Sequence, residues 1–164
     1  MLGIYGNSGL CLCLGWLKGI KMKVIDKFFG HYRFLSNFYR TDIKYDGMTY
    51  PTVEHAYQAS KSIFMQDKIK IKNCETPGQA KRLSKSLFIR DDWYDINIGI
   101  MNELIRIKFS NPKLRGKLLA TDDAILIEGN SWGDRFWGTC NGQGQNHLGI
   151  ILMTVRSELR GDDV

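Results

Sequence analysis

The chain has 164 residues, which suits one domain with a hydrophobic core and is short for two ordinary domains. Hydrophobic residues make up 43% and charged residues 24% of the chain, which are ordinary values for a globular protein. The sequence has no run of about 18 apolar residues, so we expect no membrane span. The formal charge of +6 favours anionic partners such as phosphates or nucleic acid, although the basic residues are scattered.

Residues 1–21 differ in composition from the rest of the chain, with five glycines, two cysteines and a short apolar patch. Basic residues follow that patch, whereas a secretory signal carries its positive charge in front of it. We therefore expect residues 1–21 to be an extension outside a single domain at residues 22–164. The alternative is an added strand or turn that packs on the domain.

The four cysteines show neither a C-x-x-C pair nor a zinc-ligand spacing with the three dispersed histidines. They are Cys11, Cys13, Cys74 and Cys140. We therefore expect no metal, no cofactor and no disulfide framework, and a reducing cytoplasmic location. No membrane partner is expected.

The first expected elements are short. Lys23–Phe29 is a mixed apolar stretch typical of a strand, and Gly30–Arg40 is an aromatic loop around Ser36-Asn37. Asp42–Tyr50 contains an Asp-Gly turn signal and is predicted to form a hairpin.

A helix is expected to begin at Pro51 and Thr52, because proline suits the first turn and threonine can cap free amides there. Its apolar face would consist of Val53, Ala56, Tyr57, Ser60 and Phe64. Glu54, Gln58 and Lys61 fall on a neighbouring stripe, since four and seven residues are about one and two turns. This stripe is either a solvated face with an ion pair or one edge of an active site.

Helical patterns fill most of the remaining chain. Thr76-Pro77-Gly78-Gln79 is a capping box that opens a helix through Leu87. The other expected elements are a weak helix at Gln66–Asn73, a long core helix from Asp91-Asp92 to before Asn111-Pro112, a helix at Lys113–Ala120, a strand at Ala124–Ile127 and a last helix capped by Asn146. Because the strands are few and do not alternate with the helices, we predict a compact α+β domain, predominantly helical with a small β portion.

One side of the helix after Thr76 is basic, and it is either a solvated surface or a surface that faces phosphate. Its cations are Lys81, Arg82 and Lys85, with Arg90 just beyond. The glycine-rich loop at residues 129–149 is a second phosphate candidate, because Gly144–Gly149 runs into a helix start. A Rossmann fingerprint is rejected, since His147 occupies the third glycine position. Trp132 and Trp137 flank Asp134, either as loop packing or as a stacking wall for a planar base.

Six pieces of the sequence, in order over roughly residues 27–160, resemble the NADAR (YbiA-like) family. They are Phe34-Leu35-Ser36-Asn37-Phe38, Tyr50–His55 with Gln58–Lys61, Asp92-Trp93, Leu118–Thr121, Trp132-x-Asp134-x-x-Trp137-Gly138, and Asn146-x-Leu148-Gly149 with Leu152-Met153. The resemblance implies an enzyme, an N-glycosidase that acts on phosphorylated ribosylamino intermediates of riboflavin biosynthesis or on ADP-ribosylated guanine in nucleic acid. It also implies that Glu54, Trp93 and Asp134 are functional residues. The loop Thr139-Cys140-Asn141 departs from the family's pattern, which bears on the choice of substrate.

Hydrolysis of an N-glycosidic bond builds positive charge on the anomeric carbon and negative charge on the departing nitrogen. We expect Asp134 to stabilise the cation, and Glu54 to activate water or to protonate the base. Lys61 would keep Glu54 ionised or form a Schiff base with the ring-opened sugar. The remaining predicted substrate contacts are Trp93 and Trp137 at the base, Asn37 at the sugar, Gly144 to Gly149 with Arg82 or Arg90 at phosphate, and Phe38, Gln58, Gly138 and Asn146 around them.

The predicted partner is therefore a small phosphorylated ribosyl or ADP-ribosyl compound, with nucleic acid as an alternative. The sequence also fits a module that binds ADP-ribose or NAD without cleaving it, or a structural protein in which these residues are simply buried. It does not define the oligomeric state.

Overall fold

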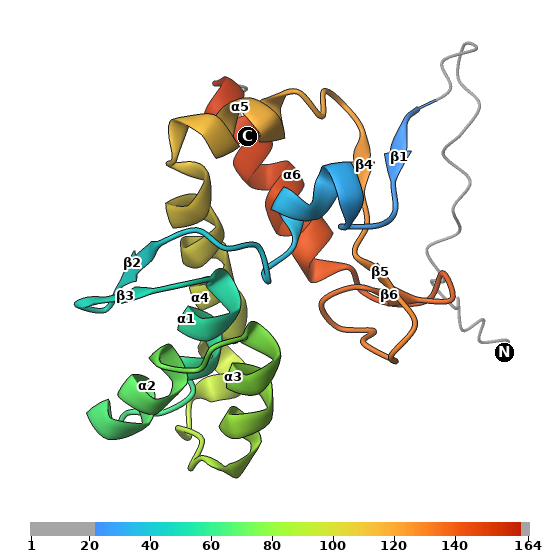
Figure 1. Cartoon of the computed structure of the whole chain (residues 1–164). Helices are drawn as coiled ribbons and strands as arrows, with labels where there is room; N and C mark the ends of the chain where they lie inside the picture. Colours follow the sequence, from blue (N-terminus) through green and yellow to red (C-terminus); the bar gives the residue numbers. More distant parts are fainter. Residues whose placement is uncertain (1–21, 162–164) are drawn as a thin grey trace, which may run out of the picture.

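The computed structural model of the protein describes residues 22–161, so the predicted extension at residues 1–21 lies outside the described residues. Helices dominate the fold, with a small β portion, and the predicted α+β class is confirmed (Figure 1). The helices are η1 Gly30–Leu35, α1 Val53–Ala59, α2 Met65–Lys72, α3 Pro77–Leu83, η2 Ser84–Ser86, α4 Trp93–Phe109, α5 Pro112–Leu119 and α6 His147–Arg160. None of the helices in this range is long and apolar enough to cross a membrane.

The described strands form three small two-stranded sheets. The strands are β1 Val24–Ile25, β2 Ile43–Tyr45, β3 Met48–Tyr50, β4 Ile125–Leu126, β5 Gly129–Asn130 and β6 Thr139–Cys140. β2 and β3 form the predicted antiparallel hairpin, and Asp46 and Gly47 take positive φ values of 49° and 72° in its turn. The β1–β4 and β5–β6 pairs are parallel and join distant parts of the chain.

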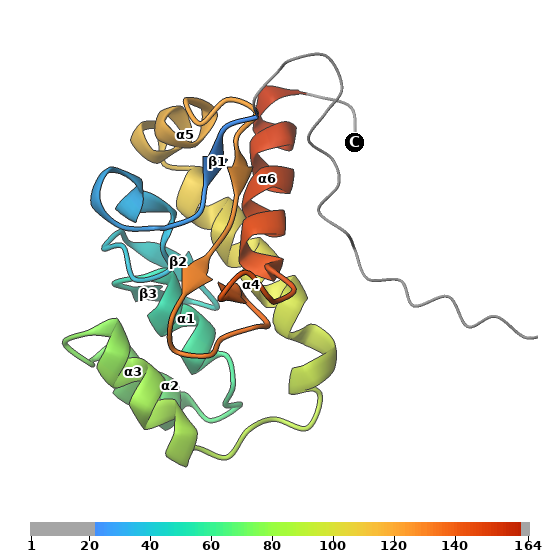
Figure 2. The ribbon, with the colours of Figure 1, turned by 90° about the vertical axis from the view of Figure 1, so that its right-hand side faces the viewer.

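The long helix α4 is the centre of the core, as its apolar periodicity predicts. It packs against α1, α5, α6 and β2. Ile100, Met101, Leu104, Ile105 and Phe109 are buried on it. Figures 1 and 2 show α1, α2 and α3 gathered at one end of the molecule, with α5 and the β1–β4 pair toward the other. The segment that carries β5 and β6 lies beside α1, because the Trp137 ring of that segment contacts Tyr57.

Local capping signals are confirmed at two helices and corrected at one. Thr52 accepts a hydrogen bond from the His55 amide, and Thr76 forms the full capping box with Gln79. Asn146 stands at the N-cap of α6, but its side chain makes no capping bond. Its Oδ1 accepts from the Glu128 amide and its Nδ2 donates to the Leu126 carbonyl, so it holds the end of β4 instead.

The helix at Pro51 is shorter than its apolar spacing predicts. It ends at Ala59, because the next residues turn the chain: Ser62 Oγ accepts from the Phe64 amide and donates to Asp67 on α2. Phe64 is consequently the N-cap residue of α2 and is 53% exposed, so its predicted place in the core is wrong. The predicted strand at Lys23–Phe29 is likewise reduced to Val24–Ile25, where its β4 partner ends.

Candidate active site

A cavity of about 610 Å³ brings together segments that are far apart in the sequence. It lies between α1, α3, the loop after η1 and the glycine-rich loop after β4. Of the predicted site residues, it is lined by Asn37, Phe38, Glu54, Gln58, Lys61, Arg82, Asp134 and Trp137. The two carboxylates proposed for the chemistry therefore share one cavity.

The start of α1 is anchored by a buried histidine. His55 Nε2 lies 3.1 Å from the Cys74 carbonyl, which can only accept, so this nitrogen carries the proton. Nδ1 then accepts from the Thr52 hydroxyl at 2.7 Å, and that hydroxyl accepts from the His55 amide. Burial lowers the pKa of His55, which keeps the ring neutral. This arrangement fixes the first turn of α1, on which Glu54 stands.

Glu54 is a buried carboxyl with an oriented partner. Its side chain is only 6% exposed, and Oε1 accepts a 2.8 Å hydrogen bond from Gln58 Nε2. Burial raises the pKa of Glu54, and the Gln58 hydrogen bond, Lys81 and Lys61 act in the opposite direction. A raised pKa makes Glu54 a stronger base than an exposed carboxylate, which suits a group that exchanges protons with a substrate or with water.

Lys61 lies over aromatic rings rather than against a carboxylate. Its Nζ is 5.9 Å from the centre of the Tyr57 ring and 5.7 Å from that of Trp93. The salt bridges among residues 22–161 do not include a Glu54–Lys61 pair. Burial lowers the pKa of Lys61, which increases the fraction of neutral, nucleophilic amine.

Trp93 does not line the cavity. It is 4% exposed and packs behind Tyr57, with the two ring centres 5.0 Å apart. Tyr57 also makes an edge contact with Trp137, at 5.4 Å between ring centres. Trp93 thus supports the side chains of Tyr57 and Lys61 from behind, and the predicted contact of Trp93 with the base is not made by this geometry.

The loop after η1 is tied to the core on both sides. The Glu54 amide donates to the Asn37 carbonyl at 3.1 Å, and the buried Lys108 Nζ donates to the Ser36 carbonyl at 2.7 Å. Asn37 Nδ2 contacts Met101 Sδ at 3.5 Å, while its buried Oδ1 has no hydrogen-bond partner within the described part of the chain. Asn37 lines the cavity and carries an acceptor without a partner among the described residues, which suits a sugar hydroxyl.

Asp134 is held by the backbone of its own turn. Its Oδ1 accepts from the Phe136 and Trp137 amides at 3.1 and 2.9 Å. Asn130 bridges the turn through both its Oδ1 and its Nδ2. The turn thus orients the Asp134 carboxylate as well as the Trp137 indole that follows it.

The basic side of α3, continued by η2, forms one wall of the cavity. Lys81, Arg82 and Lys85 line it together with Gly78. This supports the phosphate-facing interpretation of that surface, because three cations converge beside the two carboxylates.

The second predicted phosphate site does not line this cavity. A Cβ on Gly144 would approach the Gly138 carbonyl to 2.2 Å, and one on Gly149 would approach the Leu126 carbonyl to 2.1 Å. These glycines, with Asn146, allow backbone segments to pack closely. Arg90 is also directed elsewhere, because it pairs with Asp92 on the surface. These glycines are therefore needed for close packing of the backbone, and they do not form an anion-binding site at this cavity.

The sequence patterns miss several lining residues. The apolar spacing assigns Tyr57 to the core, although Tyr57 also lines the cavity, and Glu128 carries no recognisable signal. Gly138, predicted to contact substrate, is buried against Glu128: a Cβ there would lie 2.6 Å from Glu128 Oε2. The sequence does not show that Gly138 packs closely against the Glu128 side chain.

Among residues 22–161, no group of three or more His, Cys, Asp or Glu side chains is arranged to hold a metal ion.

Comparisons with known proteins point to one family. The model of the NADAR domain matches residues 27–160. A riboflavin biosynthesis protein from Vibrio vulnificus is 44% identical over 131 residues, which cover 77% of this chain and 35% of that protein. The chain therefore spans about a third of the length of that relative.

Smaller relatives match over most of their length. The N-glycosidase YbiA of Escherichia coli is 37% identical over 128 residues, covering 76% of this chain and 79% of that protein. The NMR structure of E. coli YbiA superposes with a TM-score of 0.76 at 33% identity, covering 87% of this chain and 89% of that one.

Proposed function

Because this chain belongs to the NADAR domain family and is an N-glycosidase of that family, we propose that it hydrolyses the bond between ribose and the amine of a base in a phosphorylated ribosylamino compound. The observation that carries this proposal is the single cavity in which Glu54 and Asp134 lie beside Lys81, Arg82 and Lys85. The names of the YbiA and Vibrio relatives, an N-glycosidase and a riboflavin biosynthesis protein, support the same substrate class.

The cavity meets the charge requirements of the reaction. Cleavage leaves positive charge on the anomeric carbon, which Asp134 stabilises from its rigid turn. Glu54 either takes a proton from the attacking water or gives one to the departing base. Gln58 orients the Glu54 carboxyl in both cases, because its own Oε1 is held by Ser84 Oγ at 2.5 Å.

The substrate is held at its two polar ends. Asn37 Oδ1 accepts a hydrogen bond from a ribose hydroxyl, and Lys81, Arg82 and Lys85 bind the phosphate. Phe38 and Trp137 border the sugar on the apolar sides of the cavity.

Lys61 has two chemically distinct roles open to it. As an ammonium it favours the ionised form of Glu54, which is consistent with its lowering effect on the Glu54 pKa. As a neutral amine it attacks the ring-opened sugar and forms a Schiff base, which is consistent with its own lowered pKa.

An ADP-ribosyl group on guanine in nucleic acid is the second candidate substrate, favoured by the formal charge of +6. A ligand-binding module without activity would leave every one of these substrates intact.

The test is to incubate the protein with a ribosylamino 5′-phosphate, its dephosphorylated form and an ADP-ribosylated guanine oligonucleotide, and to quantify free base and free sugar. We expect release from the first substrate at the highest kcat/KM. Release from the oligonucleotide alone would move the assignment to nucleic acid, and intact substrates throughout would refute hydrolysis.

A further inference from the structure

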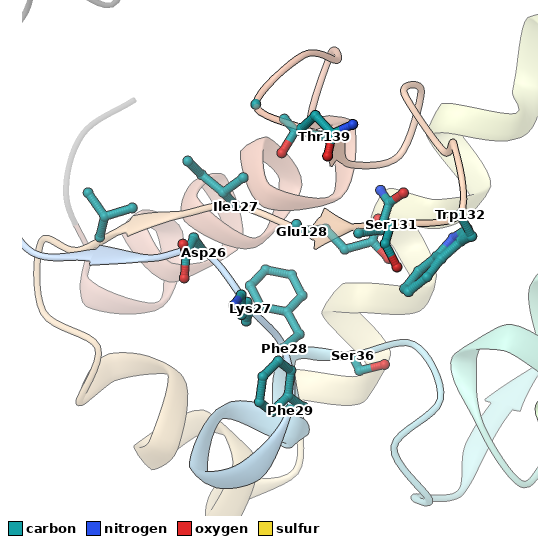
Figure 3. A pocket seen from close by; sticks show the side chains of 15 residues that line it. Asp26, Lys27, Phe28, Phe29, Ser36, Ile127, Glu128, Ser131, Trp132 and Thr139 are labelled. Atoms are coloured by element: carbon teal, nitrogen blue, oxygen red, sulfur yellow. The ribbon is translucent and has the colours of Figure 1, made fainter.

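A second cavity, of about 730 Å³, lies next to the candidate active site. The two cavities share three lining residues, Ser36, Glu128 and Trp132. Figure 3 shows Phe28 and Phe29 on the side formed by the segment after β1, and Trp132 at another side, on the loop after β5. A ligand that spans both cavities would pass these three shared side chains.

The two cavities differ in their chemistry. Lys61, Lys81, Arg82 and Lys85 all line the active-site cavity, whereas the described residues that line the second cavity include one cation, Lys27, which is accompanied by the carboxylate of Asp26. Aromatic side chains line both cavities, and in the second cavity Phe29 and Trp132 are 65% and 67% exposed. Lys27 Nζ lies 5.9 Å from the centre of the Phe29 ring. Exposed rings beside a cavity suit a planar ligand, which gains stacking where a phosphate would not. The charge difference therefore assigns phosphate to the first cavity and a planar base to the second.

Glu128 lies at the boundary with an unused polar atom. Its Oε2 is buried and has no hydrogen-bond partner among residues 22–161. A buried carboxyl oxygen without a partner is costly, so a group that binds to it is expected. Gly138 leaves space for this side chain, because a Cβ there would lie 2.0 Å from the Glu128 carbonyl and 2.6 Å from Oε2.

The surroundings of Glu128 favour its protonated form. Burial raises the pKa of Glu128 to about 7, with further raising by Asp134 and Glu54 and lowering by Lys81. A carboxylic acid with such a pKa can donate a proton at neutral pH, which an exposed glutamate cannot do efficiently.

We propose that the aromatic cavity between Phe29 and Trp132 binds the departing base, and that Glu128 donates the proton to its nitrogen. This rests on the proposed N-glycosidase function. The proton passes from the Glu128 carboxyl to the nitrogen as the bond to the anomeric carbon breaks. The water oxygen bonds to that carbon and its proton passes to the Glu54 carboxylate. The products are the free sugar and the neutral base, and proton exchange with solvent restores both carboxyls.

Equilibrium binding tests the cavity without requiring turnover. Calorimetry with free aminouracil and free guanine, and separately with ribose 5-phosphate, is carried out on the wild type and on Phe29→Ala and Trp132→Ala. We expect each variant to bind a base about 10-fold more weakly. Phe29→Ala should bind ribose 5-phosphate as the wild type does, because Phe29 does not line the active-site cavity, whereas Trp132 lines both cavities. Phe88→Ala is the matched control, because Phe88 is 68% exposed and lines neither cavity. Unchanged base affinity in both variants would overturn the assignment of the base to this cavity.

Glu128→Gln tests the proton donor, since it keeps the shape and removes the acid. We expect kcat to fall about 10²-fold at neutral pH, and the loss of rate above pH 7 in the wild type to disappear in the variant. Carboxyl ¹³C NMR of glutamate-labelled protein follows the titration directly, with the Glu128 signal identified by its absence in the variant. A Glu128 signal that titrates near pH 4.5, or a variant with an unaltered pH profile, would refute the role of acid. A wild type that releases no base would refute the proposed function instead, while the binding and NMR results would still decide on the cavity and on Glu128.

Discussion

Gln58 Nε2 donates a 2.8 Å hydrogen bond to Glu54 Oε1 from one turn further along α1. The helical spacing of the two residues predicts this contact, and burial makes it consequential, because a carboxyl that is 6% exposed depends on its partner for orientation. The orientation of Glu54 is therefore built into a single helix.

Glu54→Gln should lower kcat by about 10²- to 10³-fold with little change in KM, because it removes the ionisable group and keeps the shape. Single-turnover hydrolysis of the ribosylamino 5′-phosphate measures the effect. Glu103→Gln, the same change at an exposed position on α4, should have wild-type activity. Full activity of the Glu54 variant would remove Glu54 from the mechanism.

Asp134→Asn should distinguish the catalytic effect of the Asp134 charge from the contribution of this side chain to the structure of the turn. Asparagine retains the Oδ1 acceptor for the Phe136 and Trp137 amides, so Tm should change little while kcat falls about 10²-fold. Asp134→Ala loses both hydrogen bonds and should also lower Tm. If Asp134→Asn lost only stability, the carboxylate would have a structural role alone.

Lys61→Arg distinguishes the two roles of Lys61, because arginine keeps the positive charge and cannot form a Schiff base. With the Schiff-base role, borohydride treatment during turnover should attach the sugar phosphate to the wild type, as seen by mass spectrometry, and the variant should be inactive and unlabelled. An active variant, together with an unlabelled wild type, would instead assign Lys61 the electrostatic role.

Removing any one cation of the basic wall should weaken phosphate binding. We therefore expect KM to rise about 10-fold for the phosphorylated substrate, and to stay unchanged for its dephosphorylated form, in Lys81→Ala, Arg82→Ala and Lys85→Ala. Lys113→Ala, at an exposed position on α5, is the control. Equal effects on both substrates would argue against phosphate binding. A small substrate should also show a shallow dependence of affinity on salt, whereas nucleic acid should show a steep one.

Lys108 should make stability depend on pH. Burial lowers the pKa of Lys108 from 10.5 to about 7, so between these values the unfolded chain binds more protons than the folded one. The Lys108 contribution to the free energy of unfolding should therefore rise as pH rises from about 7 toward 10. Urea unfolding at pH 7, 8 and 9 measures this as the difference between wild type and Lys108→Met. A pH-independent difference would contradict the lowered pKa.

Short-range patterns in the sequence determined much of the secondary structure. The Asp46-Gly47 turn, the Thr76 capping box and the apolar periodicity of α4 are each decided within a few residues, so propensity and spacing suffice to predict them. The same spacing misplaces Phe64, because Ser62 turns the chain before the apolar stripe is complete.

The site required the tertiary structure, since its residues come from segments up to about a hundred positions apart in the chain. The sequence alone indicated the stripe of Glu54, Gln58 and Lys61, and a resemblance added Asp134. The tertiary structure shows that Asp134, on the loop after β4, lines the same cavity as Glu54. It also shows that Trp93 packs behind Tyr57 and that Glu128 packs closely against Gly138. Burial and long-range contact depend on how whole elements pack, and no local spacing encodes them.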